Sequence, residues 1–372
     1  MLQSPLAEQA LIAHLLDTLH ALPDVRADLS PEAADPQGTQ GPQGQPSGRG
    51  YDARLALHLA GQSLLLLLAV RKAVFPRDVR QLIWQLQATS HGTPTAQGAN
   101  ALPLLIAQSI SPGAKETLRS QRVGYYDSGG SLYLCAPGVY VYIDKPPPKS
   151  LAKTVRALFA RRRAQVLHAL LMQPQDWFGV TGLAQQARVS TATASQVLGE
   201  LERLDWLAVR GQGPGKQRQL REPTALLDAW AKQLATLPAQ AVRRYYVPGA
   251  KADTLATLLG RVCHAHQTPY AITHEAAAQR LAPFLSHVPQ VRVRLPSGAS
   301  ADAALAELGA RPVHEGANLG IIDTQPPGEL LFSQPIDGLW LASPIQIYLD
   351  LLRGEGRAKE MAEHFRQERI GF

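Results

Sequence analysis

The 372-residue sequence is poor in cysteine and contains no long apolar run. Its two cysteines, Cys135 and Cys263, exclude a disulfide scaffold and a multi-cysteine zinc ribbon. The longest purely apolar run, Leu64–Val70, is far shorter than the ~20 residues that a membrane helix needs. No basic stretch precedes an apolar one near Met1, so we expect no signal peptide. These absences predict a soluble, cytoplasmic protein without a membrane partner.

What the chain does have is length and a clear internal boundary. At ~100–200 residues per domain, its length predicts two or three domains with substantial cores. The sequence Lys145-Pro-Pro-Pro-Lys-Ser interrupts both helices and strands, because proline lacks the backbone N–H that each requires. We therefore predict a multidomain α/β (α+β) protein with domains at 1–148, 149–236 and 237–372.

Positive charge is concentrated in the middle of the chain. Residues 151–222 contain eleven basic and five acidic residues, so +6 of the formal net charge of +7 lies there. Such a concentration is typical of phosphate binding, where each neutralised phosphate releases counterions. A solvated helix face explains the same charge, and charge alone does not separate the two readings.

The first predicted domain alternates helices and strands around a polar loop. Residues 31–50 contain four Pro, five Gly and four Gln, and bury too little apolar surface to order themselves, so we expect a flexible loop. The apolar run at 64–70 predicts a strand covered on both faces. Apolar spacing and turn residues predict helices at 6–21, from Pro76 and at 112–121, two strands within 51–71, and further strands at 102–108 and within 125–142.

The middle segment predicts helices followed by a basic hairpin. We expect a long helix at 151–172, a short one at 180–187, and a third that begins after the N-cap Ser190. The third helix has a buried apolar stripe and a short-chained polar face near its start. A strand from Trp206, a tight Gly211–Gly215 loop and a basic returning strand then form the hairpin.

This order of elements resembles the winged helix-turn-helix family. The resemblance implies that the polar helix face reads base edges while basic residues contact phosphates or the minor groove. A winged helix used for protein contacts remains an alternative. The loop before Lys216 lacks the first glycine and the final Ser/Thr of a phosphate-binding P-loop. The predicted DNA-binding residues are Arg161, Arg162, Arg163, Ser190, Thr191, Thr193, Ser195, Gln196, Arg210, Lys216 and Arg218.

The first domain resembles the restriction-endonuclease-like fold, but with degenerate catalytic positions. Asp52 matches the family's first carboxylate, whereas Ala69 and Arg71 stand where an acid-x-Lys pair belongs. A methyl group cannot bind a metal, and a guanidinium stays protonated. We therefore expect no catalytic residues and no cofactor here. A metal-dependent nuclease targeted by the winged helix is the alternative, with an acid supplied from elsewhere, such as Asp78 or Asp127.

The last domain is predicted to be α/β and carries family-like motifs. We expect helices at 253–266, 274–286, 300–309 and 343–368, and strands at 290–295 and 319–323. The stretches that start at Tyr270, Glu315 and Ser343 look like the AbiEi-type antitoxin family. The resemblance covers roughly 155–372. It implies a non-enzymatic autorepressor whose operon encodes a nucleotidyltransferase-like toxin, without requiring that the two proteins bind.

Other polar groups in this domain have ordinary explanations. Asp350, Arg357 and Glu360 could form a site, but surface salt bridges account for them. Cys263-His-Ala-His266 invites a metal reading, yet residues two apart on a helix point to different sides, so we expect no metal.

Together these observations predict a sequence-specific regulator that binds double-stranded DNA. The flanking domains are candidates for dimerisation, so a homodimer is one expectation. An interaction scaffold whose winged helix binds protein is a third hypothesis.

Overall fold

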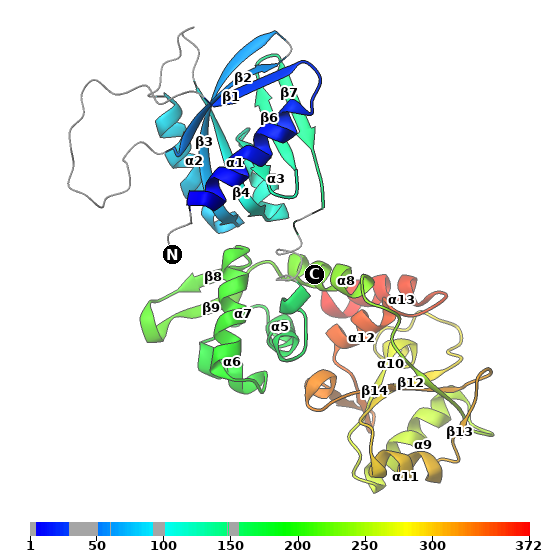
Figure 1. Ribbon diagram of the computed structural model, residues 1–372. Coiled ribbons are helices and arrows are strands. Elements are labelled where there is room, and N and C mark those ends of the chain that lie inside the picture. The colour runs from blue at the N-terminus through cyan, green and yellow to red at the C-terminus, as the bar shows by residue number, and fades with distance from the viewer. Residues whose placement is uncertain (1–4, 30–50, 60, 92–100, 147, 149–155) are drawn as a thin grey trace. The chain divides into compact units, whose positions relative to one another are not determined.

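The computed structural model describes residues 5–29, 51–59, 61–91, 101–146, 148 and 156–372 (Figure 1). The chain divides into two compact units, Met1–Val155 with Glu202–Asp205, and Arg156–Leu201 with Trp206–Phe372. Each unit combines helices with β-sheet, which confirms the predicted mixed α/β class. The loop expected at 31–50 lies outside the described residues.

The first unit is built on one seven-stranded sheet in the order β1-β2-β3-β4-β5-β6-β7. Its central strands β3, β4 and β5 run parallel, and the strands on either side of them pair antiparallel. The elements of this unit are α1 (Pro5–His20), β1 (Val25–Leu29), β2 (Ala53–Leu59), β3 (Gln62–Val74), α2 (Pro76–His91), β4 (Leu102–Ile110), α3 (Pro112–Ser120), β5 (Gly124–Asp127), β6 (Leu132–Ala136) and β7 (Val139–Ile143).

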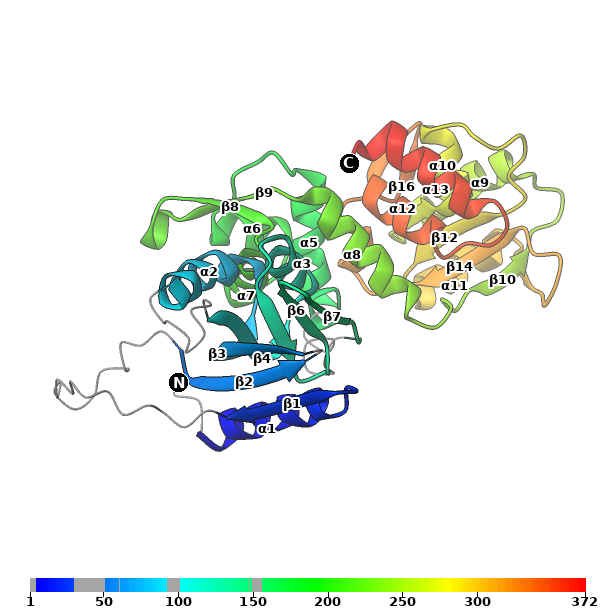
Figure 2. The same ribbon diagram turned by 90° about the horizontal axis from the view of Figure 1, so that it is seen from above.

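Helices cover both faces of this sheet (Figure 2). Alternate residues of β3 point to opposite faces. Leu66, Leu68 and Val70 pack in the core that contains α1, whereas Ala69 belongs to the core that contains α2 and α3. The prediction of an apolar strand covered on both faces is therefore confirmed.

The sequence did not reveal β1, the edge strand of this sheet. Its five residues, VRADL, do alternate apolar and polar side chains, but the run is short and only Ala27 is buried, so the signal was missed. The other predicted helices and strands of this unit are present, within a few residues of the expected ends.

The second unit begins with helices and a two-stranded hairpin. One prediction is wrong here, because the helix expected at 151–172 is broken within its described part, 156–172. The chain turns at 159–161, where Arg161 has a φ of 52°, and a new helix starts at Arg162. The elements are α5 (Arg162–Met172), α6 (Val180–Gln186), α7 (Thr191–Arg203), β8 (Leu207–Arg210), the 3-10 turn η1 (Gly213–Gly215), β9 (Gln217–Leu220) and α8 (Pro223–Ala235).

A second seven-stranded sheet follows, in the order β13-β10-β14-β12-β11-β16-β15. Helices α9 and α11 pack together, and α10, α12 and α13 form a second group (Figure 1). The strands are β10 (Arg243–Tyr246), β11 (Ala271–Thr273), β12 (Val291–Leu295), β13 (Arg311–Pro312), β14 (Leu319–Asp323), β15 (Gln334–Ile336) and β16 (Leu339–Leu341). The helices are α9 (Ala252–Ala265), α10 (His274–Leu281), α11 (Ala299–Glu307), η2 (Gly328–Leu330), α12 (Pro344–Leu351), α13 (Ala358–Phe365) and the π-helical turn η3 (Arg366–Ile370).

Two predicted helices of this region end sooner than expected. The helix expected at 274–286 stops at Leu281, because Pro283 disfavours helical geometry at the residue before it. The closing helix expected at 343–368 is interrupted between α12 and α13, where Gly356 adopts a φ of 60°. The short strands β10, β11, β13, β15 and β16 were not predicted.

Candidate nucleic-acid interface

Helix α7 starts at the residue that the sequence indicates. Ser190 precedes the helix, and its Oγ accepts a hydrogen bond of 3.2 Å from the backbone N–H of Thr193. The Thr193 hydroxyl lies 2.9 Å from the same Oγ. The turn before it places Arg188 at a φ of 50°, and Val189 N–H donates back to the carbonyl of Ala184 at 2.9 Å. This local geometry fixes the direction in which α7 leaves α6.

The two faces of α7 have opposite character. Ala194, Val197, Leu198 and Leu201 are fully buried, as the apolar stripe predicts. On the opposite face the side chains near the helix start reach solvent. Thr191, Ser195 and Gln196 are exposed, and Thr193 is half-buried because it takes part in the cap. We call Thr191, Thr193, Ser195 and Gln196 the polar face of α7.

The hairpin β8–β9 forms as predicted and carries an exposed tip. Arg210 pairs with Gln217 in the strand register, and Gly211–Gly215 are exposed. Gly211 has a φ of +73°, and a Cβ there would lie 2.8 Å from the carbonyl oxygen of Gly215. Glycine is therefore needed to close this tight tip.

The basic side chains of the hairpin are held rather than loose. The Arg210 guanidinium lies 4.3 Å from the centre of the Trp177 ring and donates to Gln217 Oε1 at 2.9 Å. Arg218 exchanges backbone hydrogen bonds of 2.8 and 2.9 Å with Phe178, which joins the hairpin to the segment before α6. Lys216 and Arg218 are half-buried and Arg210 is exposed.

The predicted arginine run divides into two parts. Arg163 donates to Gln196 Oε1 at 3.1 Å, so its side chain lies beside the polar face of α7. Arg161 and Arg162 are exposed and line a cavity that also includes residues of the C-terminal sheet region. Arg163 therefore has different neighbours from Arg161 and Arg162.

The degenerate positions of the first unit do come together. Asp52 Oδ2 accepts hydrogen bonds from Val70 N–H at 2.7 Å and from Arg71 at 3.2 Å. Ala69 is fully buried, with its methyl group in the core beside α2 and α3. In this arrangement a guanidinium, rather than a lysine amine, stands next to the Asp52 carboxylate.

The two acids that could replace the missing one have structural partners. Asp78 accepts from Phe75 N–H at 3.1 Å at the start of α2. Asp127 is fully buried, accepts from Gly129 N–H at 2.9 Å, and lies 2.7 Å from Lys115 Nζ. The sequence did not indicate this buried Lys115–Asp127 pair.

The C-terminal region contains a second buried ion pair that the sequence missed. Arg294 donates to both carboxylate oxygens of Asp350, at 2.9 and 2.5 Å, and both side chains are almost fully buried. Thr273 and Gln346 donate to the same carboxylate at 2.5 and 2.9 Å. Burial alone would raise the pKa of Asp350, but the charge of Arg294 holds that pKa below its ordinary value.

The three polar residues considered as a possible site, Asp350, Arg357 and Glu360, therefore have different environments. The surface interpretation is wrong for Asp350, which lies in the core. It is confirmed for Arg357 and Glu360, which form an exposed ion pair of 2.9 Å.

The side chains of Cys263, His264 and His266 also lie in different environments. Cys263 is buried, and burial raises the pKa of its thiol to about 12. His264 is exposed, and His266 Nε2 lies 2.7 Å from Glu307. Within the described residues, no group of three or more His, Cys, Asp or Glu side chains is placed to hold a metal ion.

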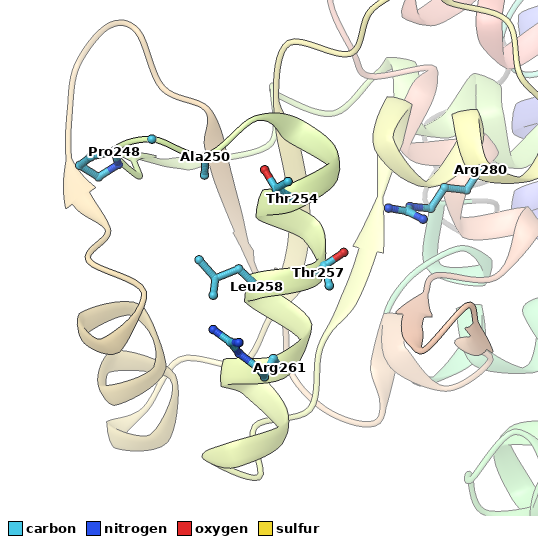
Figure 3. Close-up of a pocket in the computed structure, with 8 residues that line it drawn as sticks. Pro248, Ala250, Thr254, Thr257, Leu258, Arg261 and Arg280 are labelled. Atoms are coloured by element: carbon cyan, nitrogen blue, oxygen red, sulfur yellow. The ribbon is translucent and has the colours of Figure 1, made fainter.

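A cleft of about 590 Å³ lies beside α9 (Figure 3). Figure 3 shows Thr254, Thr257, Leu258 and Arg261 along this helix, with Arg280 on a separate one. The described lining residues include no acid, histidine or cysteine, so they offer no general base for catalysis.

Comparisons with known proteins give no relative, since no family model, no curated protein and no solved structure matches the chain. None of the described helices has both the length and the apolar composition needed to cross a membrane.

Proposed function

We propose that the chain is a sequence-specific regulator that binds double-stranded DNA through a winged helix-turn-helix formed by residues 149–236. The observation that carries this proposal is the exposure of the polar face of α7 beside a hairpin with an exposed glycine-rich tip. Short polar side chains at the start of a helix can approach base edges in the major groove. The basic hairpin residues can reach phosphates or the minor groove.

The contacts divide by their role in binding. Arg163, Arg210, Lys216 and Arg218 supply affinity through phosphates, which every sequence shares. The polar face of α7 supplies selectivity, because base-edge hydrogen bonds distinguish one base pair from another. The positive charge of residues 151–222 supports phosphate binding. The fully buried apolar stripe of α7 supports base recognition, because it determines that the polar face points to solvent.

Selection of bound fragments from random duplex DNA tests the proposal directly. A shared sequence among the bound fragments is the expected result. Ser195→Ala and Gln196→Ala should each relax the preference at a base position and cost about 1–3 kcal/mol of binding free energy there. Selection that returns no enriched sequence contradicts sequence-specific recognition.

The salt dependence of binding tests the role of the hairpin. Lys216→Ala with Arg218→Ala should weaken binding to all sequences similarly and reduce the slope of log K against log salt by about 2 units at most. Arg311→Ala with Arg369→Ala removes two exposed arginines elsewhere and is the matched control. An unchanged slope in the hairpin variant would show that the hairpin does not contact phosphates.

We further propose that this regulator is an antitoxin-like autorepressor and not an enzyme. The support is the resemblance of the C-terminal motifs, which implies an operon-linked nucleotidyltransferase-like toxin. An adjacent reading frame of that kind, together with binding to the operon's own promoter, would be the expected finding. Binding only to distant promoters would contradict autorepression.

For the first unit, the contacts of Asp52 support a structural role over metal-dependent cleavage. Its Oδ2 already accepts hydrogen bonds from Val70 and Arg71. The purified protein should leave supercoiled plasmid intact in the presence of Mg²⁺ or Mn²⁺. Nicking that Asp52→Ala abolishes would instead establish the nuclease alternative.

A further inference from the structure

A cavity of about 800 Å³ in the second unit is lined by the helical part and by the C-terminal sheet region. Its walls come from α5, α8 and α12, and from the 323–329 segment after β14. The volume lies within the roughly 300–1,000 Å³ typical of sites that bind small molecules. The proposed function does not use this cavity.

The residues that line this cavity carry a net positive charge. The lining includes five arginines and three acids. The acids already have strong partners, since Asp350 is bound by Arg294, Asp323 by Arg243, and Glu329 accepts from Thr324 at 2.6 Å. Arg161, Arg162 and Arg188 also line the cavity, and no ion pair to them is found among the described residues.

Two of these arginines are held in an unusual backbone conformation. Arg161 and Arg188 have φ values of 52° and 50°, in the left-handed region that favours glycine. A long side chain is uncommon there, and such strain concentrates at ligand-binding positions. They come from two different turns, yet both residues line the same cavity.

The cavity wall also contains a buried amide and an apolar patch. Gln240 lines the cavity, and its Oε1 is buried without a hydrogen-bond partner among the described residues. An unsatisfied buried acceptor costs free energy until a donor reaches it. The aromatic rings of Phe159 and Trp230, 6.0 Å apart, add an apolar wall. A fitting ligand therefore carries oxyanions and some apolar surface.

We propose that this cavity binds a small organic oxyanion, a phosphorylated or polycarboxylate metabolite, through Arg161, Arg162 and Arg188. Guanidinium groups bind both phosphate and carboxylate through paired, charge-assisted hydrogen bonds.

The cavity is connected to the proposed DNA-binding face through α5. Arg161 and Arg162 at the start of this helix line the cavity, and the next residue, Arg163, bonds to Gln196 on α7. A bound anion therefore changes the affinity for duplex DNA, a consequence that rests on the proposed function. Because coupling is reciprocal, DNA must change the anion affinity by the same factor, typically about 5–150-fold.

Calorimetric titration of the full chain tests the site without reference to DNA. The probes are ATP, citrate and inorganic phosphate, with adenosine as the uncharged comparison. Saturable binding of ATP or citrate that adenosine does not show is the expected result, and the stronger of the two identifies phosphate or carboxylate as the preferred group. No saturable binding by any of the three anions at millimolar concentration overturns the proposal.

Matched variants locate the site. Arg188→Gln and Arg161→Gln should each weaken anion binding about tenfold or more, because each removes charge-assisted hydrogen bonds. Arg311→Gln, an exposed arginine outside the cavity, should leave it unchanged. Circular dichroism confirms that each variant is folded. Anion binding that both cavity variants retain at full strength refutes the assignment.

The two proposals fail in distinguishable ways. If the chain binds the anion through the cavity but binds no duplex DNA, the cavity proposal stands and the proposed regulatory function is refuted. If the chain binds duplex DNA specifically but binds no anion, the proposed regulatory function stands and the cavity proposal is refuted. Equal duplex affinity with and without saturating anion overturns the coupling alone.

Discussion

Acid should destabilise the second unit through His168, a buried side chain of α5. Its Nε2 lies 2.5 Å from Ser343 Oγ, and its ring lies against Phe332 and Trp230, at centroid distances of 4.8 and 6.1 Å. Burial disfavours the charged imidazolium and lowers the pKa of His168 from 6.5 to about 3. The folded protein therefore keeps this ring neutral at a pH where the unfolded chain binds a proton.

The size of this effect follows from the difference between the two pKa values. Stability from the neutral ring is complete above pH 6.5 and is lost as the pH falls toward about 3. Each pH unit in that window costs about 1.4 kcal/mol, so at pH 5 the loss is about 2 kcal/mol. His168→Gln removes the titrating group and retains a side chain that can hydrogen-bond to Ser343.

Urea unfolding at pH 7.5 and pH 5, followed by circular dichroism, measures this contribution. The wild type should lose about 2 kcal/mol more unfolding free energy than His168→Gln over this interval. The double difference cancels the other titrating groups, which both proteins share. Equal losses in the two proteins would refute a neutral His168 in the fold.

Two further substitutions test the packing of the C-terminal region. Asp350→Ala should cost about 3–5 kcal/mol of unfolding free energy, because it leaves the buried guanidinium of Arg294 without its partner; a loss below about 1 kcal/mol in urea unfolding would contradict this. Gly260→Ala places a methyl group 2.6 Å from both Leu339 Cδ2 and Tyr270 Oη, so these side chains or α9 must shift. We expect a cost of about 1–3 kcal/mol and a lower thermal midpoint, and a raised midpoint would show that helix propensity outweighs the clash.

The sequence predicted helix starts and an apolar strand well, because these depend on residues close together in the chain. Ser190 caps α7 and Ser343 caps α12 through hydrogen bonds to residues three positions later. The continuous apolar run of β3 predicted a strand covered on both faces, and α1 on one side with α2 and α3 on the other provide that cover. In each case the signal lay in residues close together in the sequence.

Features that depend on distant partners could not be predicted in this way. No glycine or proline marks the break at 159–161, so the apolar spacing indicated one continuous helix. The carboxylate of Asp350 and the guanidinium of Arg294 lie 56 positions apart, and nothing near either residue indicates the pair. Asp350 was therefore interpreted as a surface residue.

The predicted site shows the same division. Sequence reasoning identified the polar face of α7 and the hairpin, because both follow from spacing within a few residues. It placed all three arginines of the 161–163 run together on DNA. In the structure Arg163 bonds to Gln196, whereas Arg161 and Arg162 line the cavity. Neighbouring residues of a helix point to different sides, so a run of three arginines does not share one set of partners.

The contact between His168 of α5 and Ser343 has a practical consequence for cutting the chain. Residues 156–201 and 206–372 belong to one compact unit, and α5 contacts α12 as well as α6. A fragment ending near 236 would remove Ser343 and Phe332 from His168 and expose this side of α5, so the isolated helical segment would tend to aggregate. A chimera that exchanges this helical segment would also have to exchange the C-terminal sheet region.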